Sequence, residues 1–383
     1  MYRADSAPAK SVQRYRDPER GGDSDGNWGN DHTLYRKARY AGRRDTPKGG
    51  PGGFLSIHTA ARPRAGQAPG WSRILAPQYW PTWIGIGFLR LLALLPFSLM
   101  LAVGAVLGAI LRRLPLNWVR IGRRNMELCL PELGPQARER LLNRHFASLG
   151  IALLEVPLAW WTPPARLARI ISVEGAEHLR EAQARGRGVI LLTAHFTPME
   201  MAGRMLCTVT PVNVLYRPTK NAALAYALGR CRCNLGVRPI PRDDIRALIA
   251  ALKNNEVVWY APDQSYRKKG AEMVPFFGIP AATNTLTSRI ARMTGAAVLP
   301  YFVERLPGKR GYRAVIHPPL EDFPSDSPGA DAERFHQLIE ARVRAVPEQY
   351  LWIHRRFKGL CADYPDYYAR QVPHPVQNQP QPS

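Results

Sequence analysis

Cysteine is scarce in this 383-residue chain, and the five cysteines are odd in number and scattered. Such usage excludes the disulfide framework that holds small secreted domains together. Cys231 and Cys233 form the one close pair, and no second pair of His or Cys residues accompanies them. We therefore expect reduced thiols in a cytosolic domain, and neither a zinc site nor any other metal site.

Acidic residues are also few, with 30 of them against 53 lysines and arginines, which gives a formal net charge of +23. This excess favours an anionic partner: nucleic acid, anionic lipid or an acidic protein. The basic residues are spread along the whole chain, and no zinc finger, RNP-like pattern or helix-turn-helix stands out. We therefore place a membrane surface ahead of nucleic acid as the partner and expect no nucleic-acid binding.

Residues 1–72 lack any sustained apolar period and are rich in Gly, Pro, Asp, Ser and Arg. Such a composition cannot build a core and predicts a disordered basic extension. No apolar segment directly follows a basic start, which argues against a secretory signal. A non-native extension from a mis-assigned start codon is the alternative. Residues 366–383, which are rich in Gln and Pro, are predicted to be a disordered tail.

Residues 78–113 form a long apolar block. The 21 residues Leu91–Leu111 carry no charged side chain, and about 20 apolar residues cross a bilayer core as a helix. Trp80 and Trp83 suit a membrane interface. The block predicts a membrane-anchor helix, although Pro96 weakens it, and a buried or interfacial helix is the alternative. Because the larger part of the chain follows the helix, we expect that part to face the cytoplasm.

Residues 114–365 alternate between strand and helix patterns after an initial helical stretch, Arg120–Leu154. This alternation predicts an α/β domain with a mostly parallel central sheet flanked by helices. The expected strands are Val189–Thr193, Val212–Tyr216, Glu256–Ala261, Ala297–Phe302 and Arg313–Ile316. The expected helices are Met199–Cys207, Ala222–Asn234, Asp243–Lys253, Thr285–Thr294 and Ala332–Val346.

A histidine and a carboxylate, His195 and Glu200, follow the first of these strands. A histidine at a strand-to-helix turn can act as a general base near neutral pH. We expect Glu200, one helical turn later, to reach back and hold the imidazole. No Ser or Cys lies beside His195, so the pair suits activation of a substrate hydroxyl rather than covalent catalysis. The spacing alone also fits an ordinary polar residue in a turn.

Charged and polar side chains follow two further strands. Arg217 comes directly after Val212–Tyr216, and Asp263-Gln264 follows Glu256–Ala261. Ligands of open α/β sheets bind beyond the carboxyl ends of the strands, so these residues and His195 are expected to form one site. A surface ion pair for Arg217 and a turn cap for Asp263 are the alternatives when each is taken alone.

The sequence resembles the bacterial lipid A biosynthesis acyltransferases, the lauroyl- and myristoyl-type enzymes of Kdo-lipid A synthesis. The resemblance covers residues 75–365 and is specific because several blocks occur together. These blocks are Gln78–Trp83, Arg124–Cys129, His195–Glu200, Tyr216–Pro218, Val258–Gln264, Pro275–Gly278 and Pro347–Lys358.

The resemblance implies a glycerolipid-acyltransferase-like fold anchored to the inner membrane, with its catalytic domain facing the cytoplasm. It implies transfer of a fatty acyl chain from acyl carrier protein to a hydroxyl of a 3-hydroxyacyl chain on a Kdo-lipid A precursor. By the match, His195 is the catalytic base and Glu200 its acidic partner, while Arg217, Asp263 and Gln264 fall in further blocks expected to bind substrate. No cofactor is implied.

The basic excess then has two candidate uses, because acyl carrier protein is acidic and lipid A bears phosphates. The cations that could meet either substrate are Arg232, Arg238, Arg242, Lys253, Arg267, Lys268 and Lys269. Five apolar residues either line a channel for the acyl chain or pack in the core, and core packing is the more common fate of such side chains. These residues are Trp259, Met273, Phe276, Phe277 and Ile279.

Three alternatives remain open on the sequence alone. The first is an acyltransferase of the same superfamily that acts on a phosphatidylinositol mannoside or an amino-acid lipid. The second is a membrane-anchored binding protein without catalysis, in which His195 and Glu200 would be replaceable. The third is a nucleic-acid-binding protein, which rests on net charge alone.

Overall fold

The computed structural model describes residues 71–217 and 219–369, and all of them except Trp71 belong to the compact unit Ser72–Ser383. The predicted extension over residues 1–72 lies outside the described residues apart from its last two positions. Most of the predicted tail over 366–383 lies outside them as well. Tyr368, within that tail, is buried and donates a hydrogen bond to Asn125, so packing continues past residue 365.

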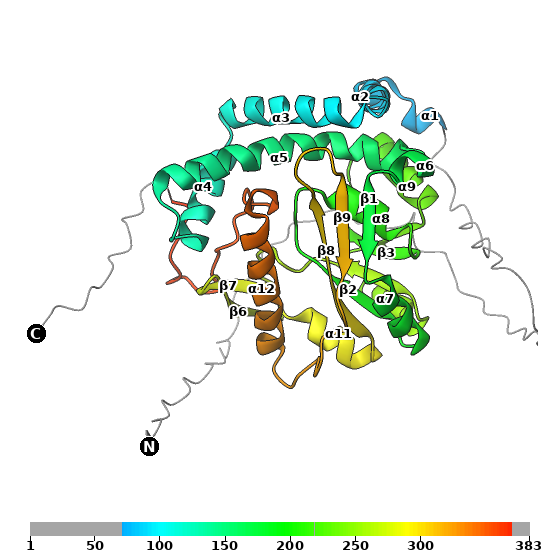
Figure 1. Cartoon of the computed structure of the whole chain (residues 1–383). Helices are drawn as coiled ribbons and strands as arrows, with labels where there is room; N and C mark the ends of the chain where they lie inside the picture. Colours follow the sequence, from blue (N-terminus) through cyan, green and yellow to red (C-terminus); the bar gives the residue numbers. More distant parts are fainter. Residues whose placement is uncertain (1–70, 218, 370–383) are drawn as a thin grey trace, which may run out of the picture. The chain divides into compact units, whose positions relative to one another are not determined.

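A seven-stranded sheet forms the centre of the fold, with the order β1-β9-β8-β2-β5-β3-β4 (Figure 1). The strands β2, β3, β4, β5 and β8 run parallel to one another, whereas β9 pairs antiparallel with β8. The mostly parallel sheet predicted from the sequence is thus confirmed. Its strands are β1 (Ile171–Glu174), β2 (Val189–Leu192), β3 (Val212–Tyr216), β4 (Val237–Pro241), β5 (Val257–Tyr260), β8 (Ala297–Arg305) and β9 (Tyr312–Ile316).

Helices cover both faces of the sheet. Because side chains alternate between the two faces of each strand, the sheet separates the core into two clusters. Ile190 and Val258 contribute to one cluster, while Leu191 and Trp259 contribute to the other. All four residues of β2 are buried, as expected for a central parallel strand. The helices of the α/β part are α4 (Trp118–Cys129), α5 (Pro135–Trp161), α6 (Pro164–Leu167), α7 (Ala176–Ala184), α8 (Met199–Leu206), α9 (Ala222–Asn234), α10 (Ile245–Lys253), α11 (Leu286–Thr294) and α12 (Pro328–Ala345).

The predicted uninterrupted helix over Leu91–Leu111 is wrong. The apolar block instead forms α2 (Trp80–Leu92) and α3 (Phe97–Arg113), after the short elements α1 (Trp71–Ile74) and η1 (Pro77–Tyr79). Pro96 immediately precedes α3 and has no N–H to continue the helical hydrogen bonds from α2. Among the described residues, no single helix is long and apolar enough to cross a membrane, while α3 and α4 meet the length and composition criteria only as a pair bent by 95°.

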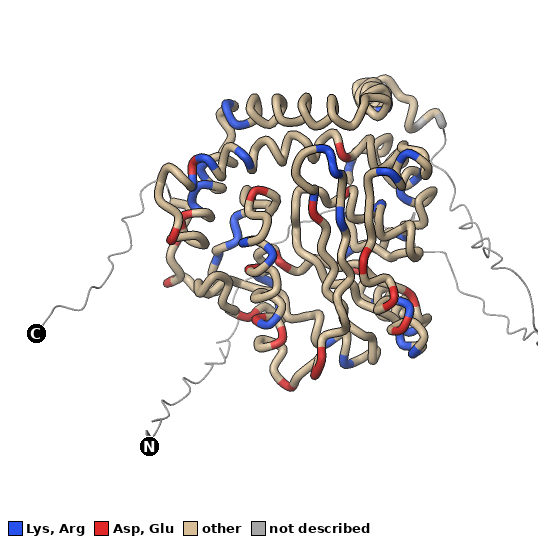
Figure 2. The backbone as a smooth tube through the Cα atoms, in the orientation of Figure 1, with Lys and Arg blue, Asp and Glu red and all other residues tan. Residues whose placement is uncertain are grey.

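α3 lies along α5 through glycines that allow close backbone approach (Figure 1). A Cβ atom added at Gly150 would overlap the backbones of Gly104 and Gly108. Small residues at such contacts bring two helices together without side chains between them. The opposite side of α3 exposes Val106 and Ile110. Figure 2 shows no charged residue on α3 before its end next to α4.

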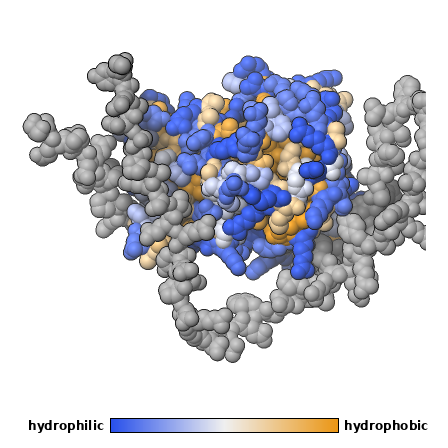
Figure 3. Space-filling view, turned by 90° about the horizontal axis from the view of Figure 1, so that it is seen from below, coloured by the Kyte–Doolittle hydropathy of each residue, from blue (hydrophilic) through white to orange (hydrophobic). Residues whose placement is uncertain are grey.

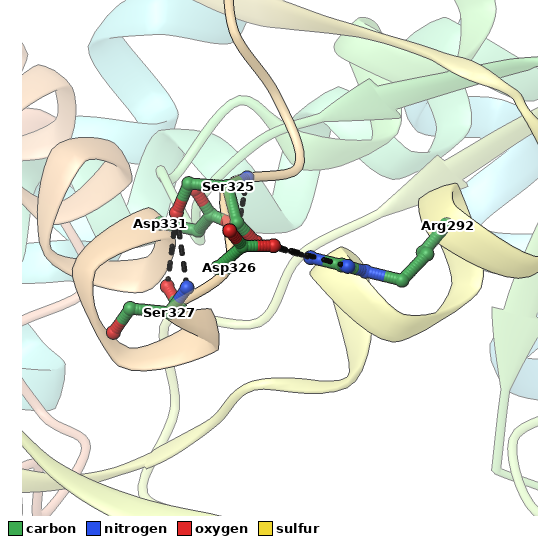
Figure 4. Close-up of polar contacts among 5 residues, drawn as sticks. All are labelled: Arg292, Ser325, Asp326, Ser327 and Asp331. Carbon is green, nitrogen blue, oxygen red and sulfur yellow. Dashed lines mark hydrogen bonds and ion pairs between the residues drawn. The ribbon is translucent and has the colours of Figure 1, made fainter.

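The start of α12 is fixed by side-chain hydrogen bonds (Figure 4). Both carboxylate oxygens of the buried Asp331 accept from the Ser325 N–H, each at 3.1 Å. The Ser327 hydroxyl caps the helix by accepting from the Ala330 N–H. Arg292 at the end of α11 pairs with Asp326, so the loop between β9 and α12 is tied to α11. An antiparallel hairpin, β6 (Ala271–Phe276) with β7 (Ile279–Asn284), packs against α12.

Candidate active site

The register of the sheet brings His195 and Asp263 together. Leu192 at the end of β2 is paired with Tyr260 at the end of β5, and each polar residue lies three positions beyond its strand end. The His195 backbone N–H donates to Asp263 Oδ2 at 2.9 Å, and the imidazole Nδ1 lies 2.6 Å from Asp263 Oδ1. The carboxylate is 2% exposed, so its charge is directed to the histidine rather than to water.

The expected contact between Glu200 and the imidazole is corrected by this geometry. Asp263 occupies the Nδ1 side of His195, while Glu200 binds two other groups. Its Oε1 accepts from Arg232 Nη2 at 2.6 Å, and its Oε2 accepts from Trp160 Nε1 at 2.9 Å. The reason is that Glu200 lies in the first turn of α8, which directs its side chain toward α5 and α9.

The His195–Asp263 pair alters the pKa of both groups. Burial disfavours the imidazolium, but the charge and hydrogen bond of Asp263 outweigh it and raise the His195 pKa above its ordinary value. Burial likewise opposes the Asp263 carboxylate, but the attraction of His195 and its hydrogen bonds lower that pKa. Because an ionised carboxylate only accepts, Nδ1 carries the proton in the neutral form of the imidazole, and Nε2 is then the nitrogen with the lone pair.

The turn that carries His195 is paired with a distant segment around Tyr350. Phe196 and Tyr350 form an antiparallel bridge, the Leu351 N–H donates to the His195 carbonyl at 3.0 Å, and the Thr197 N–H donates to the Gln349 carbonyl at 2.7 Å. In the sequence, this supporting segment falls within the Pro347–Lys358 block. Its bridge to the histidine turn cannot be read from the sequence, because the two segments are far apart in the chain.

A buried ion pair supports the same turn from α5. Arg305 Nε donates to Glu155 Oε1 at 2.7 Å, and both side chains are nearly inaccessible to solvent. Arg305 Nη1 also donates to the Ser148 hydroxyl, which shares a hydrogen bond of 2.6 Å with the Thr197 hydroxyl. No local pattern in the sequence relates positions on α5, β8 and the turn after β2, so this network could not be predicted, although Thr197 lies within the His195–Glu200 block.

Two hollows meet at His195. The first, here called the α9 hollow, has a volume of about 450 Å³, and its distinguishing residues are Trp160, Glu200, Arg204, Arg217, Leu228 and Arg232. The second, here called the basic hollow, has a volume of about 620 Å³, and its distinguishing residues are Arg242, Ile245, Tyr266, Arg267, Lys268 and Leu286. Both are also lined by His195, Met199, Val214, Leu215 and Trp259.

The predicted site residues do not all line these two hollows. Arg217 is exposed and lines the α9 hollow, whereas Gln264 is absent from the lining of either hollow among the described residues. Trp259 faces both hollows, while Phe276 is fully buried and belongs to the core. Of the candidate cations, Arg238 pairs with Glu256 away from the hollows. No group of three or more His, Cys, Asp or Glu residues that could hold a metal ion occurs within the described ranges.

Comparison with known proteins identifies the family. A family model described as bacterial lipid A biosynthesis acyltransferase matches residues 69–359. The lipid A biosynthesis lauroyltransferase of Escherichia coli (strain K12) is 38% identical over 298 residues, which is 77% of this chain and 97% of the relative. The chain belongs to this family. The lipid A biosynthesis palmitoleoyltransferase of the same strain is 38% identical over 285 residues, an alignment that covers 74% of this chain and 93% of the relative. The lipid A biosynthesis myristoyltransferase of that strain is 25% identical over 304 residues, which covers 79% of this chain and 94% of the relative.

Membership in the lipid A acyltransferase family supports acyltransferase activity for this protein. Such a transfer needs a base that can deprotonate an acceptor and space for two substrates at that base. Asp263 holds Nδ1 of His195, which leaves Nε2 of the neutral imidazole as the nitrogen that can accept a proton. The α9 hollow and the basic hollow provide space on two sides of it.

Proposed function

We propose that the protein transfers a fatty acyl chain from acyl carrier protein to a hydroxyl of a 3-hydroxyacyl chain on a Kdo-lipid A precursor. The hydrogen-bonded pair His195–Asp263 at the meeting point of two hollows is the observation that carries this proposal. Family membership supports the reaction type. The donor, the acceptor hydroxyl and the roles of individual residues are part of the proposal.

The reaction begins when His195 Nε2 removes the proton from the acceptor hydroxyl. The acceptor oxygen then attacks the thioester carbonyl and forms a tetrahedral intermediate with a negatively charged oxygen. Preorganised donors stabilise such an oxyanion, and we assign this role to Arg217 with backbone N–H groups at the start of α8. When the carbon–sulfur bond breaks, the imidazolium returns its proton to the thiolate. The products are an ester and the free thiol of the carrier, with no covalent acyl-enzyme.

Asp263 and Glu200 have different roles in this mechanism. Asp263 fixes the tautomer and orientation of His195 and stabilises the imidazolium that forms. Glu200, held by Arg232 and Trp160, is the one acidic residue in the lining of the α9 hollow among those described. It therefore acts on the site through its charge and through the placement of Arg232, not through a hydrogen bond to the imidazole.

The protein acts at the inner membrane in this proposal, with its catalytic domain facing the cytoplasm. One side of α2 exposes Trp80, Ile84, Phe88 and Leu91, which are 59–72% exposed and recur every three or four residues. An apolar stripe of this kind suits a helix that lies in the membrane interface. This arrangement corresponds to the interfacial alternative for the apolar block rather than to a spanning helix.

Mass spectrometry of lipid A from the host tests the proposal. We compare cells that carry the wild-type gene, a deletion, and the His195→Ala variant. Loss of one acyl mass in both mutants is expected and identifies the transferred chain. Loss in the deletion alone would refute His195 as the base. An unchanged lipid A in the deletion strain, with any paralogous acyltransferase also removed, would refute lipid A as the acceptor and favour another glycolipid or a role in binding alone.

A further inference from the structure

We infer that the two hollows divide the substrates: the α9 hollow receives the lipid acceptor, and the basic hollow receives the donor on an acidic carrier protein. This inference rests on the proposed function and adds the assignment of each side of His195 to one substrate. Both substrates are anionic, so charge alone does not make the assignment. The position of each hollow relative to the exposed apolar helix decides it.

The α9 hollow adjoins α2, the helix with the exposed apolar stripe. Asn221 at the start of α9 donates to the Thr82 hydroxyl of α2 at 2.9 Å, and Tyr226 of α9 contacts the Trp83 ring edge to face. Arg90 of α2 lies over the ring of Trp161, next to the hollow-lining Trp160. α2 thus packs directly against α9, the helix that contributes Leu228 and Arg232 to the lining of this hollow, so the hollow lies beside the helix with the exposed apolar stripe.

The rim of the basic hollow carries exposed cations on segments that face water. Arg242, Arg267 and Lys268 line this hollow and are exposed, and Asp243 is its one acidic lining residue among those described. Arg242 pairs with Asp243 at 3.8 Å, whereas Arg267 and Lys268 form no ion pair among the residues that the structure describes, so the charges of these two are available to a partner. Exposed cations of this kind steer an acidic protein toward its docking site and set its orientation.

Figure 3 views the molecule from below Figure 1, and hydrophilic residues surround separate apolar areas there. A soluble carrier protein needs a hydrated, charged rim for docking, whereas a lipid needs a path that continues from the membrane. The two hollows meet these needs separately and share His195 and Trp259 where the acyl group is transferred.

Charge reversal of the rim tests the assignment. We expect the double variant Arg267→Glu with Lys268→Glu to raise KM for the acylated carrier protein about tenfold or more, because repulsion replaces attraction at the docking rim. The KM for the lipid acceptor should stay within about twofold. Added salt should reduce the difference from wild type, because exposed charges are screened.

The matched control reverses two exposed cations that line neither hollow, Arg180→Glu on α7 with Arg185→Glu at the C-terminal cap of the same helix. Both KM values should remain at wild-type levels in this control. A rise in KM for the acceptor in the rim variant would place the lipid in the basic hollow and overturn the assignment. Unchanged KM values for both substrates would also overturn it.

A second acyl donor distinguishes loss of carrier-protein docking from damage to the active site. An acyl thioester of N-acetylcysteamine carries no charge and no protein, so it does not depend on the rim for docking. If the rim variant lost activity with this donor to the same extent as with the carrier protein, the inference would be refuted. Failure of the proposed function would already be seen with the wild-type protein, which would then not acylate the Kdo-lipid A precursor with the acylated carrier protein as donor.

Discussion

His195 and Asp263 lie 68 residues apart in the chain, yet the imidazole Nδ1 and the carboxylate Oδ1 are 2.6 Å apart. The pairing of β2 with β5 produces this contact, since both residues stand three positions beyond paired strand ends. The acidic partner of the histidine is thus provided by the neighbouring strand, while the acid nearest in sequence, Glu200, pairs with Arg232.

We predict that Asp263→Asn and His195→Ala each lower kcat by about 10²- to 10⁴-fold, the usual range for loss of general base catalysis. The double variant should be little worse than His195→Ala alone, because residues that act as a unit are strongly non-additive. Glu200→Gln should add a separate loss on top of Asp263→Asn. Steady-state kinetics of the purified proteins measure these effects, with His178→Ala on α7 as the control.

Additive losses for His195 and Asp263 would contradict their action as one unit. Strong non-additivity between His195 and Glu200 instead would restore Glu200 as the direct partner. The control is suitable because His178 is partly exposed and lines neither hollow.

The pH dependence of activity should report the same pair. The base must be neutral, and Asp263 raises the His195 pKa, so kcat/KM should fall as pH decreases through that raised value. In Asp263→Asn the attraction to the imidazolium is lost while burial remains. The acidic limb of the profile should therefore move to lower pH, together with the fall in kcat. An acidic limb at the same pH in both proteins would contradict assignment of the limb to His195.

Stability should decrease on the acidic side because of three other histidines. Burial lowers the pKa of His145 and His354 to about 4 and that of His336 to about 3. Below the ordinary value of about 6.5 the unfolded chain binds protons that the native protein does not, so the free energy of unfolding falls from there toward pH 3–4. The urea midpoint measured against pH should show this slope.

A variant with one titrating group fewer checks the source of that slope. His145 Nδ1 lies 3.0 Å from the Glu348 carbonyl, and Asn can donate a hydrogen bond in its place without titrating. We expect His145→Asn to show a shallower decline in stability between pH 6.5 and 4. The raised pKa of His195 acts in the opposite direction, since its stabilisation is complete below pH 6.5 and is lost as pH rises through the folded value.

The sequence predicted five of the seven strands of the main sheet, because these are largely apolar runs of the length that buried strands require, whereas β1 and β4 were not predicted. Val212–Tyr216 and Ala222–Asn234 were predicted with the bounds that the structure has. β4 was missed because Pro239 and Pro241 interrupt its pattern, which an edge strand tolerates. The hairpin of β6 and β7 was missed because its residues lack a clear alternation and lie outside the main sheet.

The sequence predicted which residues lie near His195 at the strand ends better than it predicted how they pair. His195, Arg217 and Asp263 were identified because they follow strands, and strand ends are local features of the sequence. Which acid meets the histidine depends on register and on the direction of α8, and neither is a local feature. The buried pair Arg305–Glu155 escaped prediction for the same reason, because 150 residues separate its members.

Removal of one member of that buried pair should destabilise the protein strongly. Arg305→Met leaves the Glu155 carboxylate without its cation in the interior, and a change of this kind costs about 3–5 kcal/mol. Urea unfolding should show a large decrease in the free energy of unfolding. The double variant Arg305→Met with Glu155→Met should recover much of the loss, since no buried charge remains. As a control, Asp326→Asn at the exposed pair with Arg292 should change stability little.

Membrane binding should depend on the exposed stripe of α2. We predict that replacing Ile84, Phe88 and Leu91 by serine shifts the protein from the pellet to the supernatant when it is sedimented with anionic vesicles. Each of these side chains is more than half exposed, so the change removes apolar surface from the interface and leaves the core intact. The matched control replaces Leu338 and Leu360, which are 36% and 43% exposed on other segments. Equal binding of all three proteins would contradict α2 as the membrane contact and would remove the basis for placing the lipid acceptor in the α9 hollow.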